Sequence, residues 1–331
     1  MPNFTHKCKG SNIYLDSSSQ FACDVLMGLT ARNKFLQSKY FYDNAGSLLF
    51  QKIMALPEYY LTKSEEEIFS KQREKIFSVF SYNAESINLI ELGAGDGSKT
   101  KILLQYFASK NYTHKYTAID ISKKALLILG NILKSILPDL SIKLIHEEYF
   151  KGLLHEGTIA NEKRVLLFLG SNIGNFLLKD SIEFLQNVRG KLNVGDQIMI
   201  GFDLKKSSNV VLDAYNDTEG ITSAFNLNLL TRINRELNAN FNLDNFSHKP
   251  SYNSNTGEAK SFIESKISQT VFIENLDIEI QFLKDELIHT EISRKYDLNE
   301  ISIMAKQSGF RVIDNLLDEK EYFCDSIWEA C

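Results

Sequence analysis

Long apolar runs and an excess of positive charge are both missing from this sequence of 331 residues. Its apolar stretches, such as Val165–Leu169, are far too short to cross a bilayer, and the polar start of the chain has no apolar signal core. The formal net charge of −5 gives no basic footprint for nucleic acid. We therefore expect a cytoplasmic, monomeric protein that binds a small molecule and neither membranes nor nucleic acid.

Residue spacings typical of disulfide frames and metal sites are missing as well. The four cysteines lie near the two ends of the chain without a CxxC pair, so we expect reduced thiols rather than a disulfide frame or a zinc site. The six histidines form no HExxH pattern, and His146 beside two glutamates is more typical of a solvated residue than of a metal ligand. The sequence predicts no metal site.

A glycine-rich turn stands out from this background. The short apolar run Ile87–Leu92 ends in three glycines that alternate with other residues in Gly93–Gly97, and a helix-like pattern follows. Strand, glycine turn and helix in this order are typical of a cofactor-binding crossover in a parallel α/β sheet. A dinucleotide site needs a further glycine five residues after the first, where this chain has Ser98. The turn therefore indicates a different cofactor.

The polar residues of the turn favour S-adenosylmethionine as that cofactor. Asp96 would repel a pyrophosphate but suits the cationic amino group and sulfonium of this molecule. Without a Cβ, Gly93 and Gly95 let an adenosyl group approach the backbone. Asp120, at the end of the next expected strand, supplies an acceptor for the ribose. The combination predicts a methyltransferase that releases S-adenosylhomocysteine; the alternative is a turn that merely connects strand to helix.

The rest of the chain first continues and then leaves the strand–helix alternation. Residues from about 206 to 285 are rich in Asn and Ser, with one helical stretch and two alternating segments, Ala259–Ile267 and Val271–Phe282. We interpret this region as an insertion that forms a second lobe. The other parallel strands are expected at 116–120, 140–145, 164–170 and 197–202.

Two loops after these strands carry candidate residues. Ligands of open α/β sheets bind at the carboxyl ends of strands, so Asn172 or Asn175 would face the transferred group, unless both only close Asx turns. After the third strand, Glu148 could accept from an adenine amine while Tyr149 packs near the ring. An acidic surface turn is the alternative for Glu148.

Outside the sheet, two stretches are ambiguous. Tyrosines gather around Lys39–Ser47 and at Tyr59, where core packing is favoured over a pocket wall, and Ser47 could cap the apolar helix that follows. In a strand ending near Tyr296, Glu291 and Ser293 would share one face, for which a solvated edge is the simpler interpretation.

Six motifs in one order sharpen this interpretation. They resemble the L-histidine Nα-methyltransferases of ergothioneine biosynthesis and the fungal relatives that N-methylate prenylated tryptophan. The likeness extends from Lys39 to Tyr296. The motifs are Phe41–Ser47, Leu56–Tyr60, Glu91–Gly95, Leu169–Asn175, Ala214–Asp217 and Thr290–Ser293.

The resemblance implies an architecture: a Rossmann-like class I methyltransferase sheet with a smaller α+β substrate-binding lobe. Residues 65–205 and 291–331 would form the cofactor-binding domain, and residues 1–64 and 206–290 the substrate-binding domain. It also implies two sets of site residues. The cofactor set is Gly93, Gly95, Lys99 and Asp120, with Glu148 and Tyr149 at the adenine. The substrate set is Asn175 and Tyr215 at the carboxylate and amino end, Tyr59 beside the amino acid, and Tyr42, Glu291 and Ser293 at the imidazole.

The activity implied is transfer of methyl groups to the α-amine of L-histidine, up to the trimethylated betaine (hercynine). Tyr42, Tyr59 or solvent could receive the proton that the amine loses. Where the histidine enzymes usually have a methionine near the substrate side chain, this chain has Ser261, which predicts a roomier and more polar pocket. The alternatives are an N-methyltransferase for another aromatic amino acid or amine, and a non-catalytic sensor of S-adenosylmethionine or a metabolite.

Overall fold

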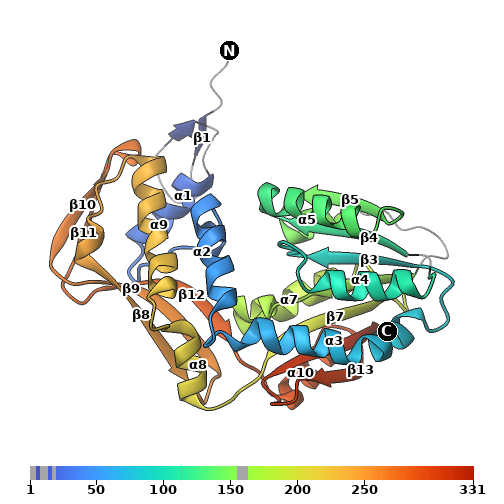
Figure 1. The fold of residues 1–331 in the computed structure, drawn as a ribbon. Helices are drawn as coiled ribbons and strands as arrows, with labels where there is room; N and C mark the ends of the chain where they lie inside the picture. Colours follow the sequence, from blue (N-terminus) through green and yellow to red (C-terminus); the bar gives the residue numbers. More distant parts are fainter. Residues whose placement is uncertain (1–4, 8–13, 17–19, 113, 155–162) are drawn as a thin grey trace. The chain divides into compact units, whose positions relative to one another are not determined.

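The computed structural model describes residues 5–7, 14–16, 20–112, 114–154 and 163–331. The chain forms two compact units (Figure 1). The one we call the sheet domain consists of Tyr60–Ser207, Ser254–Glu258 and Ser293–Cys331. The one we call the lobe consists of Met1–Tyr59, Ser208–Asn253 and Ala259–Ile292. Each unit has its own sheet and its own buried apolar core.

The sheet domain is built on seven strands in the order β13-β14-β7-β6-β3-β4-β5. The five strands from β7 to β5 pair in parallel, whereas β14 runs antiparallel to both of its neighbours. Because β4 and β6 lie on either side of β3, the carboxyl ends of these three strands meet at one edge, where such sheets bind ligands. The Rossmann-like α/β prediction is confirmed. The bounds are β3 Ile87–Leu92, β4 His114–Asp120, β5 Ser141–His146, β6 Lys163–Phe168, β7 Gln197–Asp203, β13 Phe310–Leu317 and β14 Phe323–Ala330.

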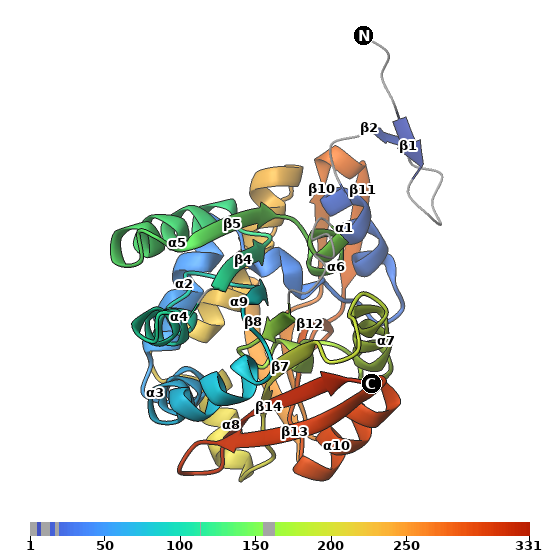
Figure 2. The ribbon, with the colours of Figure 1, turned by 90° about the vertical axis from the view of Figure 1, so that its right-hand side faces the viewer.

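Helices cover both faces of this sheet. Figure 2 shows α3, α4 and α5 on one face and α6, α7 and α10 on the other. Strands β3 and β7 are buried along their whole length, as expected of parallel strands covered on both sides. The helices, with the 3-10 turn η2, are α3 Tyr60–Ser81, α4 Thr100–Ser109, α5 Lys123–Ile136, α6 Tyr149–Leu154, η2 Asn172–Asn175, α7 Leu178–Arg189 and α10 Leu298–Gln307.

The antiparallel pair β13–β14 completes the sheet domain and was not predicted from the sequence. Trp328 of β14 is fully buried, and its ring stacks on Phe202 of β7 with centroids 5.8 Å apart. Phe310 of β13 packs against the same indole at 5.9 Å. The last strand is therefore part of the core rather than a terminal extension.

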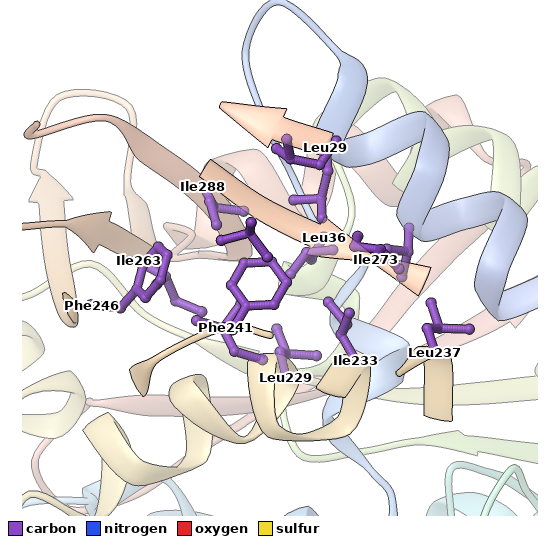
Figure 3. Packing of buried hydrophobic residues seen from close by; sticks show 14 of the residues in the cluster. Leu29, Leu36, Leu229, Ile233, Leu237, Phe241, Phe246, Ile263, Ile273 and Ile288 are labelled. Atoms are coloured by element: carbon purple, nitrogen blue, oxygen red, sulfur yellow. The ribbon is translucent and has the colours of Figure 1, made fainter. Parts of the chain in front are cut away.

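The lobe combines helices with a three-stranded sheet of order β12-β9-β8. Figure 3 shows Leu229 and Ile233 of helix α9 with Ile263 and Ile288 of the sheet around the ring of Phe241. This core confirms the α+β character predicted for the lobe. The elements are β1 Thr5–Lys7, β2 Tyr14–Asp16, α1 Gln20–Thr30, η1 Ser38–Phe41, α2 Asn44–Ala55, α8 Ser208–Tyr215, α9 Ile221–Leu237, η3 Leu243–Asn245, β8 Phe246–Asn253, β9 Glu258–Ser265, β10 Gln269–Ile273, η4 Glu274–Leu276, β11 Ile278–Phe282 and β12 Leu287–Arg294.

The predicted cap of α2 is wrong. The helix begins at Asn44, and its N-cap is Asp43, whose carboxylate accepts from the backbone N–H of Gly46 at 2.7 Å. Asp43 has the extended backbone that an N-cap requires, whereas Ser47 lies inside the helix. Its N–H already donates to the carbonyl of Asp43 at 2.9 Å.

The second alternating segment of the insertion forms two strands, not one. Strands β10 and β11 pair as an antiparallel hairpin, and η4 makes the turn between them. Asp277 ends that turn with a φ of 50°, in the left-handed region that Asp tolerates better than most residues. The alternation of side chains is thus kept on both arms of a hairpin.

The cysteines differ in part from the prediction. Cys324 and Cys331 are free thiols, the first buried and the second exposed. Cys23 is disulfide-bonded, so the expected reduced thiol is wrong at this position, and Cys8 lies outside the described residues. In the described part of the chain, no helix is both long and apolar enough to cross a membrane. Nor do the described His, Cys, Asp and Glu side chains form any group of three or more that could hold a metal ion.

Candidate active site

The glycine turn follows β3 and has a left-handed backbone at all three glycines. The φ angles are 79° at Gly93, 55° at Gly95 and 65° at Gly97, a region that glycine adopts without strain. A Cβ on Gly93 would lie 3.1 Å from the Tyr149 hydroxyl. A Cβ on Gly95 would meet no atom of the described residues within 4 Å, its chain neighbours aside. The turn is therefore crowded at its first glycine and open at its second.

Asp120, the last residue of β4, is fixed beside this open position. Its carboxylate accepts from the backbone N–H of Gly95 at 2.9 Å and from that of Ser122 at 2.7 Å. Burial raises the pKa of Asp120, although the two backbone donors oppose the shift. Each oxygen has a further lone pair. The carboxylate can therefore accept hydroxyl donors from a ligand above Gly95.

Tyr149 and Asn172 lie against the same turn, whereas Glu148 does not point into the domain. The Tyr149 ring packs edge-on against Phe168 of β6, with centroids 5.4 Å apart, and burial raises the pKa of its hydroxyl. The amide nitrogen of Asn172 would lie 3.2 Å from a Cβ on Gly93. Glu148 is exposed and lies 3.8 Å from the Lys151 ammonium. The structure thus brings Tyr149 and Asn172, but not the Glu148 carboxylate, against the glycine turn.

Lys99, just before α4, is held by a carboxylate from α3. Its ammonium forms an ion pair with Glu65, whose other oxygen accepts from the backbone N–H of Gly170 at 2.7 Å. Burial would lower the pKa of Lys99, but the charge of Glu65 outweighs burial and raises it. Glu65 therefore joins the glycine turn to the loop after β6.

Glu91, in β3, forms buried hydrogen bonds next to the glycine turn. It accepts from the Thr100 hydroxyl at 2.7 Å and from the Tyr116 hydroxyl. Burial raises the pKa of Glu91 to about 7 in spite of these two donors. The motif acid is thus a buried support that connects β3, β4 and α4.

In the lobe, Tyr42 and Tyr59 flank one phenylalanine. The centroid of the Phe50 ring lies 5.5 Å from that of Tyr42 and 6.2 Å from that of Tyr59. Phe225 of α9 packs against Tyr42 at 5.9 Å. Asp43 accepts from Asn228 at 2.9 Å and pairs with Arg235 at 2.7 Å, which fixes the backbone after Tyr42. The two tyrosines are thus ordered by aromatic packing.

Strand β12 carries the motif Thr290–Ser293, and its side chains alternate between two environments. The Thr290 hydroxyl is buried and donates to Asn226 at 2.8 Å and to the carbonyl of Ser261 at 3.0 Å. Glu291 is partly exposed and, by the period of two, points to the opposite face, as does Ser293. Ser261 is buried with the core-facing residues of β9. We therefore do not expect Ser261 to widen a pocket on the face of Glu291.

The last two predicted substrate residues lie at element ends. Asn175 is the final residue of η2 and is partly exposed, and Gly174 before it packs so closely that a Cβ there would lie 2.7 Å from the carbonyl of Arg294. Tyr215 ends α8 and is 9% exposed. The close packing of Gly174 fixes the backbone that carries Asn175.

Comparison with known proteins identifies the family. The family model described as "Histidine-specific methyltransferase, SAM-dependent" matches residues 21–330. This chain belongs to that family. It is 34% identical to the histidine N-alpha-methyltransferase of Mycolicibacterium smegmatis, over 87% of this chain and 88% of the relative. The histidine N-alpha-methyltransferase of Mycobacterium tuberculosis is 31% identical, with 89% and 90% covered. Ergothioneine biosynthesis protein 1 of Schizosaccharomyces pombe is 28% identical over 84% of this chain and 36% of its own length.

The methyltransferase also contains a buried ionic network that the sequence did not predict. Asp203, the last residue of β7, is fully buried and pairs with Lys295 at 2.7 Å and with Lys206. It also accepts from the Tyr60 hydroxyl, whose oxygen lies 2.8 and 2.9 Å from the two carboxylate oxygens. Burial would raise the pKa of Asp203, but the two lysines lower it. The carboxylate is therefore ionised within the domain.

This network reaches two candidate substrate segments of the methyltransferase. The backbone N–H of Asp203 donates to the Ser171 hydroxyl at 3.1 Å, in the loop that leads to Asn175. The Lys295 ammonium donates to the Ser293 hydroxyl at 2.8 Å. The end of β7 is thus connected to both segments.

A sequence signal for Glu65 was available. Leu61, Glu65 and Ile68 follow the helical spacing of the buried face of α3, so this acid interrupts an apolar stripe. A charged residue on such a face needs a buried partner. No comparable signal exists for Asp203, because its partners come from distant parts of the chain.

Proposed function

We propose that this enzyme transfers methyl groups from S-adenosylmethionine to the α-amine of L-histidine, up to the trimethylated betaine. The observation that carries the proposal is membership of the histidine-specific family over nearly the whole chain. The motif Thr290–Ser293 adds an acceptor and a hydroxyl on one face of β12, which suits an imidazole with its N–H and its lone pair. The sheet domain would bind the cofactor, and the substrate-binding domain expected at residues 1–64 and 206–290 would bind much of the substrate.

The glycine turn fits the adenosyl part of the cofactor. The open position at Gly95 leaves room for a group to lie on the backbone, and Asp120 beside it has lone pairs for ribose hydroxyls. We propose Gly93, Lys99 and Tyr149 as further contacts, with Glu148 near the adenine. When bound, S-adenosylmethionine supplies an electrophilic methyl group on its sulfonium.

The protein's main contribution would be placement of the amine. A methyl group moves by in-line displacement, so the amine nitrogen needs to lie about 3 Å from the methyl carbon on the sulfur–carbon axis. We propose that Asn175 and Tyr215 bind the carboxylate and amino end. Ammonium has no lone pair, so a proton leaves first, and Tyr42, Tyr59 or solvent receives it. Repeated transfer then requires that the pocket admit an amine with one and two methyl groups.

Mass spectrometry of the products tests the activity. The enzyme is incubated with methyl-labelled S-adenosylmethionine and, separately, with histidine, tryptophan, phenylalanine, tyrosine and histamine. Labelled mono-, di- and trimethylhistidine are expected. Preferred labelling of another amino acid would show that this amino acid, and not histidine, is the substrate. Binding of S-adenosylhomocysteine without any labelled product would instead support a non-catalytic sensor.

Substitution of Glu291 tests the predicted contact with the ring. Glu291→Ala removes a charge-assisted acceptor, which is expected to raise the KM for histidine about tenfold to hundredfold. The KM for S-adenosylmethionine should change little. Glu279→Ala, an exposed acid on β11, is the matched control and should leave both constants unchanged. Equal increases of both constants in Glu291→Ala would remove the assigned role.

We also propose that the enzyme is a cytoplasmic monomer, as the acidic, ordinary globular composition suggests. Light scattering on a size-exclusion column tests the monomer. A stable dimer would correct this part of the proposal without affecting the chemistry.

A further inference from the structure

A buried lysine determines how the Ser293 hydroxyl can bond. Lys295 is completely buried, and its ammonium donates to the Ser293 oxygen at 2.8 Å and pairs with Asp203 at 2.7 Å. An ammonium has three N–H donors and no acceptor. The Ser293 oxygen is therefore the acceptor in this contact, and the hydroxyl hydrogen points to a different partner.

The lysine is held in this position from several sides. Asp203 accepts from Tyr60 and pairs with Lys206, so the carboxylate that anchors Lys295 is itself fixed. The backbone also confines the side chain, because the N–H of Lys295 donates to the carbonyl of Gly257 at 2.7 Å. Because Asp203 is the charge partner of this lysine, the ammonium cannot leave its place between Asp203 and Ser293 without unpairing a buried charge.

We infer that Lys295, anchored by Asp203, is a positioning residue that makes the Ser293 hydroxyl a hydrogen-bond donor toward the substrate ring. The inference rests on the proposed function, in which Ser293 contacts the side chain of the substrate. Glu291, two residues earlier on the same face of β12, can only accept when ionised. The pair thus selects a ring with one N–H and one nitrogen lone pair, which is a neutral imidazole.

This selection differs from recognition by shape alone. A pyrrole ring offers the N–H for Glu291 but no acceptor for Ser293, and a thiazole ring offers the acceptor but no N–H. An indole likewise has an N–H and no ring acceptor. A buried hydroxyl that finds no acceptor costs free energy, so rings without the lone pair are rejected even when they fit.

The experiment compares histidine with ring analogues of similar size: the 2-yl and 3-yl isomers of pyrrolylalanine and the 4-yl and 5-yl isomers of thiazolylalanine, which place the nitrogen at either ring position. The better isomer of each analogue is used for the comparison. For the wild type, kcat/KM with the pyrrole is expected to be about tenfold to hundredfold below that with histidine. In Lys295→Met the ammonium no longer binds the Ser293 oxygen, so the hydroxyl can turn its hydrogen away from the ring. It is then not left without an acceptor beside a pyrrole, and this preference should fall to within about threefold. The KM for histidine should rise, and the KM for S-adenosylmethionine and the preference of histidine over the thiazole should not change.

Four further variants keep the inference falsifiable. Lys295→Arg also presents only donors and should restore the preference for histidine over the pyrrole. Lys205→Met, which removes a lysine paired with Asp297 and Glu300 instead, should behave like the wild type. If Lys295→Met does not fold, the pair Ser293→Ala and Ser293→Thr replaces it: the preference is lost with Ala and retained with Thr.

Two results would overturn the inference. One is a wild type that methylates the pyrrole as well as histidine. The other is a Lys295→Met enzyme that is slower with every substrate but keeps the wild-type preferences, which would make Lys295 a purely structural residue. Failure of the wild type to methylate histidine at all would instead refute the proposed function, so the two failures are distinguishable.

Discussion

The sheet domain and the lobe position their candidate residues by different means. In the sheet domain, the backbone defines the site: Gly95 has a left-handed φ of 55°, and Asp120 accepts directly from two backbone N–H groups. In the lobe, Tyr42 and Tyr59 are positioned by ring packing around Phe50. We conclude that the candidate cofactor residues Gly95 and Asp120 depend on local chain geometry, whereas the candidate substrate residues Tyr42 and Tyr59 depend on the integrity of a distributed core.

The largest expected effect is on the lobe. Phe225→Ala removes a ring that packs on Phe41 at 4.5 Å and on Tyr42, and burial of such a ring stabilises by about 3–5 kcal/mol. Chemical denaturation should show this loss, and the KM for histidine should rise while S-adenosylhomocysteine still binds by calorimetry. Phe272→Ala, at a partly exposed ring on β10, should cost far less. Loss of S-adenosylhomocysteine binding in folded Phe225→Ala would contradict the division of labour.

Glu91 is expected to make the stability of the sheet domain depend on pH. Its folded pKa is raised to about 7, so between its ordinary pKa and 7 the folded state binds more protons than the unfolded state. Stability is therefore lost as pH rises through this window, by about 3 kcal/mol in total. Glu91→Gln should flatten the dependence measured by denaturation between pH 4.5 and 8, whereas Glu85→Gln, at an exposed acid, should keep it. An unchanged slope in Glu91→Gln would show that another group titrates.

Substitution of Asp120 tests whether the residues beside the glycine turn bind the cofactor and not histidine. Asp120→Asn removes the charge and one acceptor beside Gly95, and hydrogen bonds to charged groups contribute about 1.5–3 kcal/mol. The KM for S-adenosylmethionine should rise about tenfold to hundredfold, with the KM for histidine little changed. Asp139→Asn, an exposed acid between α5 and β5, is the control. A larger effect on histidine than on S-adenosylmethionine would reverse the assignment.

Two glycines of the turn give the smallest and most specific comparison. Alanine at either Gly95 or Gly97 costs about 1–2 kcal/mol for its left-handed backbone. At Gly97 a Cβ would also lie 2.2 Å from a methyl of Leu129, so thermal denaturation should show a further loss there. Gly95→Ala should weaken S-adenosylhomocysteine binding more than Gly97→Ala. Only a Cβ at residue 95 would enter the open space that we propose for the ligand. The reverse order would place the ligand elsewhere.

The parallel sheet could be predicted because strands such as β6 and β7 contain continuous apolar runs that end in recognisable turns. Strand β3, the glycine turn as far as Gly95, and Asp120 could be predicted in this way. One strand–turn–helix unit followed by the next strand determines where the turn and the acid lie. Strands β13 and β14 could not be predicted in this way. Asp325 and Glu329 interrupt the apolar pattern of β14, although Asp325 is fully buried.

The network around Asp203 shows the other limit of the sequence. Tyr60 and Lys295 lie far from Asp203 along the chain and meet it only through folding. Periodicity reports on local burial, so it cannot pair a lysine with a distant carboxylate. In the lobe, Tyr42 and Tyr59 pack against the apolar core, as composition favoured, whereas the role in substrate binding that we propose for them came only from family resemblance.

The central claim is that the α-nitrogen of histidine, not its ring, receives the methyl group. Tandem mass spectrometry of the product formed with methyl-labelled S-adenosylmethionine locates the label directly. The account predicts that all label is on the α-nitrogen, because we propose that Glu291 and Ser293 bind the ring. Label on an imidazole nitrogen would contradict it.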